Sequence, residues 1–505
     1  MKNLTLEELF YFAFFILLSI TKGLGFYEGQ ALFKLLVILA FICALIKIFI
    51  TPYTKKQWAV QLVLLSLSVL IYYESRSLGI LFIMFTILGM KDISVKKVFK
   101  IGLYTWSACA IALSIFSFFR LEHTIYRVHP KIGLGPIFRW SLGFTHPNIL
   151  HITYLVLCAY IIYELAEYYT LKHFVLLMLG NLLVFVYSVS YTGFGITALL
   201  LAGGLYIKIR PKFNLIEKSA ANLLLPIIII VSFVLPLMFN MKWVQKINDI
   251  LGSRILLAKL FLIPEYVSLF GVKTADVVTA SITLDSSYIW GFINYGIIPF
   301  ALFMIAYLIL IADYSHKQKT RELLIIISFV IAGFTEQLLF NTSFKNITLF
   351  FLGELLFRQK EDAKEYCLFP SLQRGIVLPI KRLNIIIPKL KKCVVYVCAG
   401  AVIGVILCAI IRTEPNGYIV PRTYTDGYAK DSFIYLESDT PADYDGYVVM
   451  NYKDAETPMQ IVEGNAVWLE TVRYFLGSLI IGGAAGYLIC TLWVNARGGV
   501  KVHGD

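Results

Sequence analysis

Long uninterrupted apolar runs constrain this chain more than any other feature. Two of them are NLLLPIIIIVSFVLPLMF at 222–239 and CVVYVCAGAVIGVILCAII at 393–411. A helix needs about 20 apolar residues to cross roughly 30 Å of hydrocarbon. Because lipid offers the backbone no hydrogen-bonding partner, such a run must satisfy its own N–H and C=O groups, as a helix does. We therefore expect an all-α polytopic membrane protein.

The overall composition supports this class. Of the 505 residues, 58% are hydrophobic and 15% are charged, whereas a soluble domain has roughly a quarter of its residues charged. The N-terminal run carries Glu7 and Glu8 where a signal peptide has basic residues, so we expect a retained first span. The net charge of +13 is concentrated between apolar runs. It therefore indicates membrane orientation and contact with membrane lipids, and no nucleic-acid partner is expected.

Apolar windows separated by charged residues predict fourteen spans. The first twelve form a predicted membrane core over residues 1–360, followed by a basic cytoplasmic linker at 361–392. A C-terminal module at 393–505 has two spans that flank a small outer segment at about 412–470. The windows lie near 7–22, 30–50, 57–73, 77–90, 101–119, 149–168, 173–188, 194–208, 222–240, 288–311, 323–340, 346–358, 393–411 and 471–494.

The charges of the connections predict an orientation. TPYTKKQ, KDISVKKVFK, KIRPKFNLIEKS, DYSHKQKTRE and the stretch 358–392 all fall on one side and are rich in Lys and Arg. The positive-inside rule places them in the cytoplasm, together with both termini. The long connections 120–148, 241–287 and 412–470 are then outside.

The cysteines and carboxylates predict no cofactor. None of the eight cysteines belongs to a C-x-x-C pair or a zinc pattern, so we predict small core residues and no disulfide. No clustered carboxylate motif suggests a magnesium site, and we expect no bound metal.

Basic residues in the first two outer loops run against the orientation rule. A guanidinium presents a planar fork of donors that suits phosphate oxygens. Arginines near one outer face are therefore candidates to bind a phosphate or pyrophosphate. Alternatively, they extend from span ends or pair with nearby acids. The candidates are Arg120, Arg127, Arg139 and Arg254, with Arg76 on an adjoining outer turn.

Two residues are candidates for proton transfer. A histidine can accept or donate a proton near neutral pH, which makes His146 in GFTHPN a candidate, although His-Pro-Asn also favours a helix start, with Asn148 helping to cap it. Asp285 in LDSSY is either a base or the N-cap of the next span. Glu336 lies near the end of an apolar run, where a carboxylate is costly and usually has a partner. Asn341 lies in the same outer turn.

Over residues 57–360 the chain resembles the O-antigen polymerase and ligase superfamily, in its Wzy-type polymerase branch. The resemblance depends on the order and spacing of GFTHPN, YSVSYTGFGITALLLAG, KINDILGSRILLAKLFL, SLFG, LDSSYIWGFINYGIIPF and TEQLLFNTSFKNITLFFLGELLF. It implies a GT-C-like glycosyltransferase of the outer face of the bacterial cytoplasmic membrane. Its substrates would be undecaprenyl-pyrophosphate-linked oligosaccharide repeat units, and its product a capsule, exopolysaccharide or O-antigen type of polysaccharide. A flippase and a chain-length regulator are the implied protein partners.

The resemblance also implies roles for particular residues. Arg254 in LGSRI matches the arginine that grips the pyrophosphate. His146 and Asn148 match the HPN signature, and Asp285 and Tyr288 match D-x-x-Y. The family commonly has Ser-Arg-Thr where this chain has Ser-Tyr-Thr at 190–192. Arg139 or Arg76 would then have to supply the missing charge.

The residues themselves are compatible with a metal-independent, inverting transfer. Arginines would stabilise the pyrophosphate leaving group, while His146 or Asp285 would take the acceptor proton. One alternative is a transporter or flippase for lipid-linked sugars, but the polar groups concentrate in outer loops rather than at the midplane. Another is an O-antigen ligase, which usually has a histidine where this chain has Asp285. Residues from 361 onward fall outside the resemblance and form an unassigned accessory module.

Overall fold

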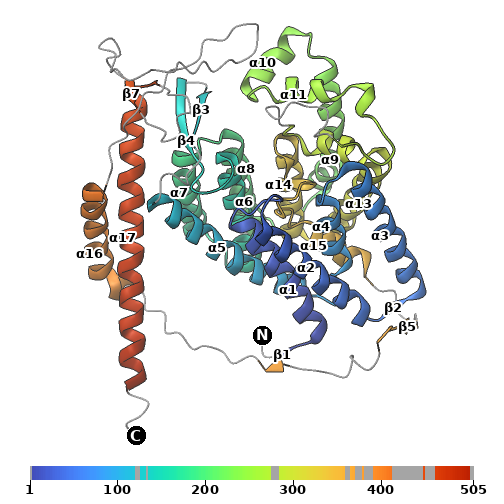
Figure 1. Cartoon of the computed structure of the whole chain (residues 1–505), viewed down its shortest axis with the longest axis horizontal. Coiled ribbons are helices and arrows are strands. Elements are labelled where there is room, and N and C mark those ends of the chain that lie inside the picture. The colour runs from blue at the N-terminus through green and yellow to red at the C-terminus, as the bar shows by residue number, and fades with distance from the viewer. Residues whose placement is uncertain are drawn as a thin grey trace. The chain divides into compact units, whose positions relative to one another are not determined.

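The described part of the chain is predominantly helical (Figure 1). The computed structural model describes residues 3–119, 126–131, 135–273, 284–358, 364–369, 378–379, 390–411, 447–449 and 461–500. Within these ranges, nine helices are long and apolar enough to cross a membrane. The expectation of an all-α polytopic membrane protein is confirmed at that level.

Every predicted span overlaps a helix. The first nine are α1 (Leu6–Gly23), α2 (Ala31–Ile50), α3 (Lys55–Ser75), α4 (Gly79–Leu88), α5 (Val95–Phe119), α6 (Pro147–Leu165), α7 (Leu171–Ser188), α8 (Tyr191–Ile209) and α9 (Leu215–Leu237). The next two helices, α10 (Lys242–Ile250) and α11 (Arg254–Phe261), lie in the predicted outer connection 241–287. The remaining helices are α12 (Ser287–Tyr295), α13 (Ile297–His316), α14 (Thr320–Thr335), α15 (Leu349–Leu356), α16 (Leu390–Ile411) and α17 (Gly464–Val500).

Polar residues at the ends of the apolar runs set where several helices begin. Thr5, Thr54 and Asn214 each accept a hydrogen bond from the backbone N–H three residues later. The side chains of Glu8, Gln57 and Glu217 each accept a hydrogen bond from the backbone N–H of the capping residue, which completes a capping box. Each box satisfies two N–H groups that the first helical turn would otherwise leave unpaired.

The predicted span 288–311 is divided in the structure into α12 and α13. Gly296 separates them at a φ of 86°, and a Cβ there would collide with the backbone of Leu269, Phe270 and Gly271. Residues before α12 stabilise this break in the helix, since Ile297 N donates a hydrogen bond to Ser268 O at 2.9 Å. The apolar pattern continues through Gly296, so hydrophobicity alone does not show this break.

The chain forms two compact units. The first comprises Met1–Leu113, Asn148–Phe185 and Ser190–Ile380, and the second Ser114–Pro147, Val186–Val189 and Lys381–Asp505. The second unit groups the C-terminal helices with two earlier segments that the division predicted from sequence assigned to the core.

Aromatic packing fills the interior of the first unit. The ring of Phe99 on α5 lies 5.2 Å from that of Tyr160 on α6 and 5.3 Å from that of Phe351 on α15. Two short antiparallel pairs join segments that are distant in sequence: β1 (Asn3–Leu4) with β6 (Leu378–Pro379), and β2 (Tyr53–Thr54) with β5 (Glu365–Tyr366).

The second unit contains an antiparallel hairpin and a close helix pair. The hairpin joins β3 (Tyr126–Lys131) to β4 (Gly135–Trp140), and β7 (Tyr447–Val449) pairs with β8 (Ile461–Glu463). On α16, a Cβ at Gly404 would lie 2.9 Å from the Cα of Gly482 on α17. Small residues thus let the two helix backbones approach closely, which is common between membrane helices.

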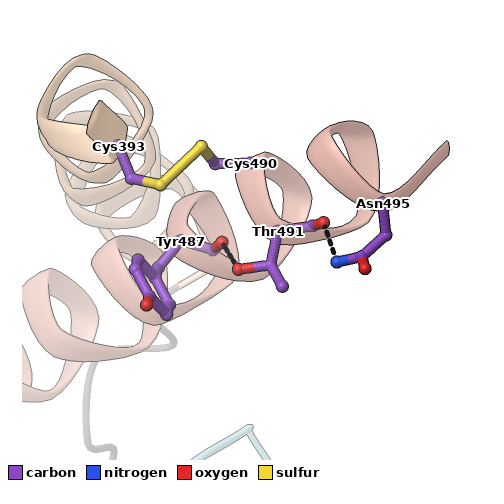
Figure 2. The surroundings of a disulfide bond; sticks show 5 residues. All are labelled: Cys393, Tyr487, Cys490, Thr491 and Asn495. Atoms are coloured by element: carbon purple, nitrogen blue, oxygen red, sulfur yellow. Dashed lines mark hydrogen bonds between the residues drawn. A yellow bond between two sulfur atoms is a disulfide. The ribbon is translucent and has the colours of Figure 1, made fainter. Parts of the chain in front are cut away.

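A disulfide joins α16 to α17, so the prediction of no disulfide was wrong. Figure 2 shows Cys393 and Cys490 paired across the two helices. Their Cα atoms are 5.9 Å apart although 97 residues separate them in sequence. The sequence spacing gives no sign of this pair because only the packing of the two helices brings the cysteines to the same level. Among the described cysteines, Cys43, Cys109, Cys158, Cys367 and Cys398 are free.

Candidate functional site

Arg254 lies at the start of α11, after a sharp turn. Gly252 and Ser253 both have positive φ, at 64° and 66°, and redirect the chain from α10 into α11. The guanidinium is largely buried: Nε donates to Thr335 O at 2.8 Å and Nη1 to Leu251 O at 3.0 Å. These backbone contacts fix the orientation of the arginine.

Two carboxylates flank Arg254. Its Nη2 lies 2.9 Å from Oε1 of Glu336, which caps the C-terminus of α14, and its Nε lies 3.4 Å from Oδ2 of Asp285, which precedes α12. The Glu336 side chain is 12% exposed and that of Asp285 is 30% exposed. Asp285 is therefore the more accessible of the two to an incoming ligand.

Glu336 connects the arginine to two further helices. Its Oε1 accepts a hydrogen bond from Asn148 Nδ2 at 3.2 Å and another from Thr192 Oγ1 at 3.3 Å. Asn148 is the second residue of α6 and Thr192 the second residue of α8. The cluster of Arg254, Asp285, Glu336, Asn148 and Thr192 is called the Arg254 cluster below. All five lie at or beside helix ends in the first unit.

A small pocket lies next to Arg254, between α9, α11 and α14. Ser286 and Thr335 line it together with Arg254 and apolar residues such as Pro236 and Phe334. Within the described residues, the hydroxyls of Ser286 and Thr335 are buried without a hydrogen-bond partner. Buried polar groups are normally satisfied, so these hydroxyls are free to bind a ligand atom.

Sequence patterns identify the charged residues of this site but not the hydroxyls. Arg254, Asp285, Glu336 and Asn148 are predicted separately, and the structure brings them together. Ser286 directly follows Asp285, and Thr335 directly precedes Glu336. That adjacency is the one signal that could have selected them, since Ser and Thr are otherwise common at helix ends.

Three other predicted residues have separate partners in the first unit. Tyr288 is fully buried and its hydroxyl donates to Val330 O at 2.7 Å, which fastens α12 to α14. Asn341 Oδ1 accepts from Ser343 N at 3.0 Å. Arg76 caps α3, and its guanidinium lies 4.9 Å from the ring centroid of Tyr73.

The remaining candidates belong to the second unit. Arg139 is 2% exposed and its Nε donates to Ser188 O, the last carbonyl of α7, at 2.7 Å. Arg127 is its cross-strand partner in the hairpin register, and the Arg127 side chain is outside the described residues, as is Arg120. His146 is half-buried in the turn before α6, which begins at Pro147 as the His-Pro-Asn pattern predicts.

A buried arginine of α17 is absent from the candidates that the sequence suggests. Arg473 is fully buried, donates to Val186 O at 2.7 Å and lies 5.8 Å from the ring centroid of Trp140. Arg139 and Arg473 therefore both bind carbonyls of the last turn of α7, where a positive charge is favourable. A lone arginine in the apolar run of α17 was the available signal.

No family model, curated protein or solved structure matches this chain. In the described ranges, no group of three or more His, Cys, Asp and Glu side chains is arranged to hold a metal ion.

The Arg254 cluster has the groups for one kind of chemistry. A guanidinium has five N–H donors, and three are used in the contacts with Thr335, Leu251 and Glu336. Two N–H groups thus remain for a ligand oxygen while the cluster stays intact. A partly exposed carboxylate beside them can accept a proton, so the arrangement suits transfer of a group from a phosphate leaving group to a hydroxyl.

Proposed function

We propose that this chain polymerises undecaprenyl-pyrophosphate-linked oligosaccharide repeat units on the outer face of a bacterial cytoplasmic membrane. The observation that carries the proposal is the Arg254 cluster, in which one arginine, two carboxylates and an amide converge from four distant segments at helix ends. The motifs shared with Wzy-type polymerases support the same activity. In this proposal the membrane core is GT-C-like, with about twelve spans.

The basic connections support an outer location for the site. Thr192 begins α8, and Lys208 and Arg210 lie at its other end. Glu336 ends α14, and Arg321 lies at its start. At about 1.5 Å per residue, helices of 16 and 19 residues span about 24 and 28 Å, close to the hydrocarbon thickness. Basic connections inside the cell would therefore put the Arg254 cluster outside and both termini in the cytoplasm.

The proposed reaction transfers the growing chain from its lipid diphosphate to the next repeat unit. Arg254 binds oxygens of the donor diphosphate, where negative charge develops as the anomeric C–O bond breaks. The acceptor hydroxyl forms the new glycosidic bond and its proton passes to Asp285. His146, the other candidate base that the sequence suggests, belongs to the second unit. Attack opposite the leaving diphosphate inverts the anomeric centre.

In this proposal the donor diphosphate binds while Arg254 keeps its ion pairs with Glu336 and Asp285. Glu336 keeps the guanidinium oriented and holds Asn148 and Thr192, while Ser286 and Thr335 offer hydroxyls beside it. The proposed steps use no metal ion.

The test uses purified full-length protein in nonionic detergent with a defined lipid-linked repeat unit. A polymerase gives a series of products that differ by one repeat. A flippase leaves the substrate unchanged, because detergent removes the two membrane faces. A ligase gives no series until a different acceptor is added. Unchanged substrate with folded protein would overturn the proposal.

A further inference from the structure

Two lysines of the first unit lie outside the Arg254 cluster, with Lys345 buried and Lys22 half-buried. Lys345, in the connection between α14 and α15, is 3% exposed, and its Nζ lies 5.0 Å from the ring centroid of Trp106 on α5. Lys22, in the last turn of α1, has its Nζ 4.5 Å from the ring centroid of Phe33 on α2. Both ammonium groups thus lie over aromatic faces.

Trp106 connects the two lysines. Gly23 follows Lys22, and a Cβ on it would lie 3.7 Å from Cε3 of the Trp106 ring. The end of α1 therefore packs on the same indole that faces Lys345. Burial, and then the charge of Lys22, lower the pKa of Lys345 to about 7. The two cations are close enough to repel each other.

Neither lysine has a carboxylate partner among the described residues. Glu28 is an exposed residue of the turn between α1 and α2, and it forms no ion pair with Lys22 in the described structure. Lys91 is different: it is 1% exposed, and its Nζ lies 2.7 Å from Glu365 and 3.5 Å from Asp92. Lys91 thus has the counter-charge that an isolated buried cation requires, whereas the fully buried Lys47 donates to Lys91 O at 2.6 Å.

Three donors that pack against the lysines or lie close to them in sequence have no hydrogen-bond partner among the described residues. The indole Nε1 of Trp106 is buried without a hydrogen-bond partner within the described part of the chain. The same holds for the hydroxyls of Ser343, two residues before Lys345, and Ser19, one turn before Lys22. A phosphate has several acceptor oxygens and the charge to offset two lysines.

We propose that Lys22, Lys345 and Trp106 form a second phosphate-binding site, separate from the Arg254 cluster. Its ligand class is a lipid-borne diphosphate, an assignment that rests on the proposed function. Polymerisation joins two lipid-linked diphosphates in each cycle, so one anion site serves the donor and another the acceptor. The lysine site would then hold the acceptor lipid while Arg254 holds the donor.

The test counts bound diphosphates by native mass spectrometry of the full-length protein in nonionic detergent. The probes are undecaprenyl diphosphate and, separately, inorganic pyrophosphate. We expect the wild type to bind two undecaprenyl diphosphates, and K22Q and K345Q to bind one, with affinity at the lost site weakened at least about tenfold. R254A should retain the lysine site. K34Q is the matched control, because Lys34 is an exposed lysine beside Phe33.

A stability measurement keeps the result interpretable if a variant binds poorly. K345M removes an unpaired buried charge, so its Tm without ligand should equal or exceed that of the wild type. Undecaprenyl diphosphate should raise the Tm of R254A, in which the lysine site is the remaining anion site, and should raise that of R254A/K345M much less. Pyrophosphate that competes fully with the lipid would show that the diphosphate alone is recognised. Binding of the lipid alone would show that the polyprenyl chain is also required.

Two unaltered binding events in K22Q and K345Q would overturn the second site even if a product series forms. Conversely, two bound diphosphates without any product series would leave the second site standing and overturn the proposed function. The two proposals therefore fail separately.

Discussion

At the scale of single residues, Glu336 Oε1 is the atom that organises the Arg254 cluster. It accepts from Arg254, Asn148 and Thr192, which belong to three different helices. A carboxylate can accept several hydrogen bonds, and those from charged donors are the strongest. The short distance of 2.9 Å to Arg254 therefore identifies the ion pair as the main contact, with the two neutral donors adding orientation.

Replacing Glu336 tests that ranking. E336Q keeps the shape and one acceptor oxygen but removes the charge opposite Arg254, so we expect turnover to fall by roughly 10- to 100-fold. T192V removes only the hydrogen bond of 3.3 Å and should lower turnover by less than about tenfold. Initial rates of polymer formation give both values, with Tm as the folding control. A larger loss in T192V than in E336Q would contradict this ranking.

Residue-level prediction works best where a residue type is rare in its surroundings. Charged residues stand out in an apolar chain, so the amino-acid sequence alone identifies Arg254, Asp285 and Glu336 as candidates. It does not identify Ser286 or Thr335, because hydroxyls are common near helix ends and their missing partners appear only in three dimensions. Ser-Tyr-Thr at 190–192 stands where the resemblance leads one to expect Ser-Arg-Thr, which draws attention to a missing arginine. In the structure it is Thr192 of this segment that binds Glu336.

At the scale of elements, the polar residues of the Arg254 cluster all lie at or beside helix ends. α6, α8, α11, α12 and α14 each bring a polar residue to the Arg254 cluster from a first or last turn or from the residue next to it. Apolar runs are sufficient to locate α6, α8, α12 and α14, because a membrane helix must be continuous and apolar. They do not locate α11, which lies in the predicted outer connection 241–287. They also do not show the break at Gly296, since the sequence on both sides is equally apolar and the break depends on backbone contact with 269–271.

The break at Gly296 is expected to require glycine. G296A would add a Cβ against the backbone of Phe270 and Gly271, at a φ that L residues rarely adopt. We expect a loss of stability of about 1–3 kcal/mol from the conformation, and more from the collision. Thermal unfolding in detergent measures it. G195A is the matched control, because a Cβ on that helical glycine meets nothing within 4 Å; equal Tm values for the two variants would argue against a tight break.

At the scale of the whole molecule, the basic connections and the Arg254 cluster lie at opposite ends of α8 and α14. The basic connections contact one another, as in the hydrogen bond of 2.7 Å from Phe213 N to Gln318 Oε1. The polytopic class follows from composition alone. The partition into two units and the disulfide pair do not, because both depend on contacts between segments that are distant in sequence.

Orientation can be checked with single added cysteines. Lys246 on α10 and Lys212 between α8 and α9 are both exposed, and we place Lys246 outside and Lys212 inside the cell. A membrane-impermeant maleimide added to intact cells should label K246C and not K212C, with labelling of both after permeabilisation. The reverse pattern would place the Arg254 cluster in the cytoplasm.

The most direct test of the central claim compares R254A with K246A in the polymerisation assay. Arg254 would stabilise the leaving diphosphate, so its loss should slow formation of the product series by about 10²- to 10³-fold, with Tm and substrate consumption recorded in parallel. K246A removes an exposed charge from the neighbouring helix and should retain the wild-type rate. A product series that forms at the wild-type rate in R254A would contradict the account.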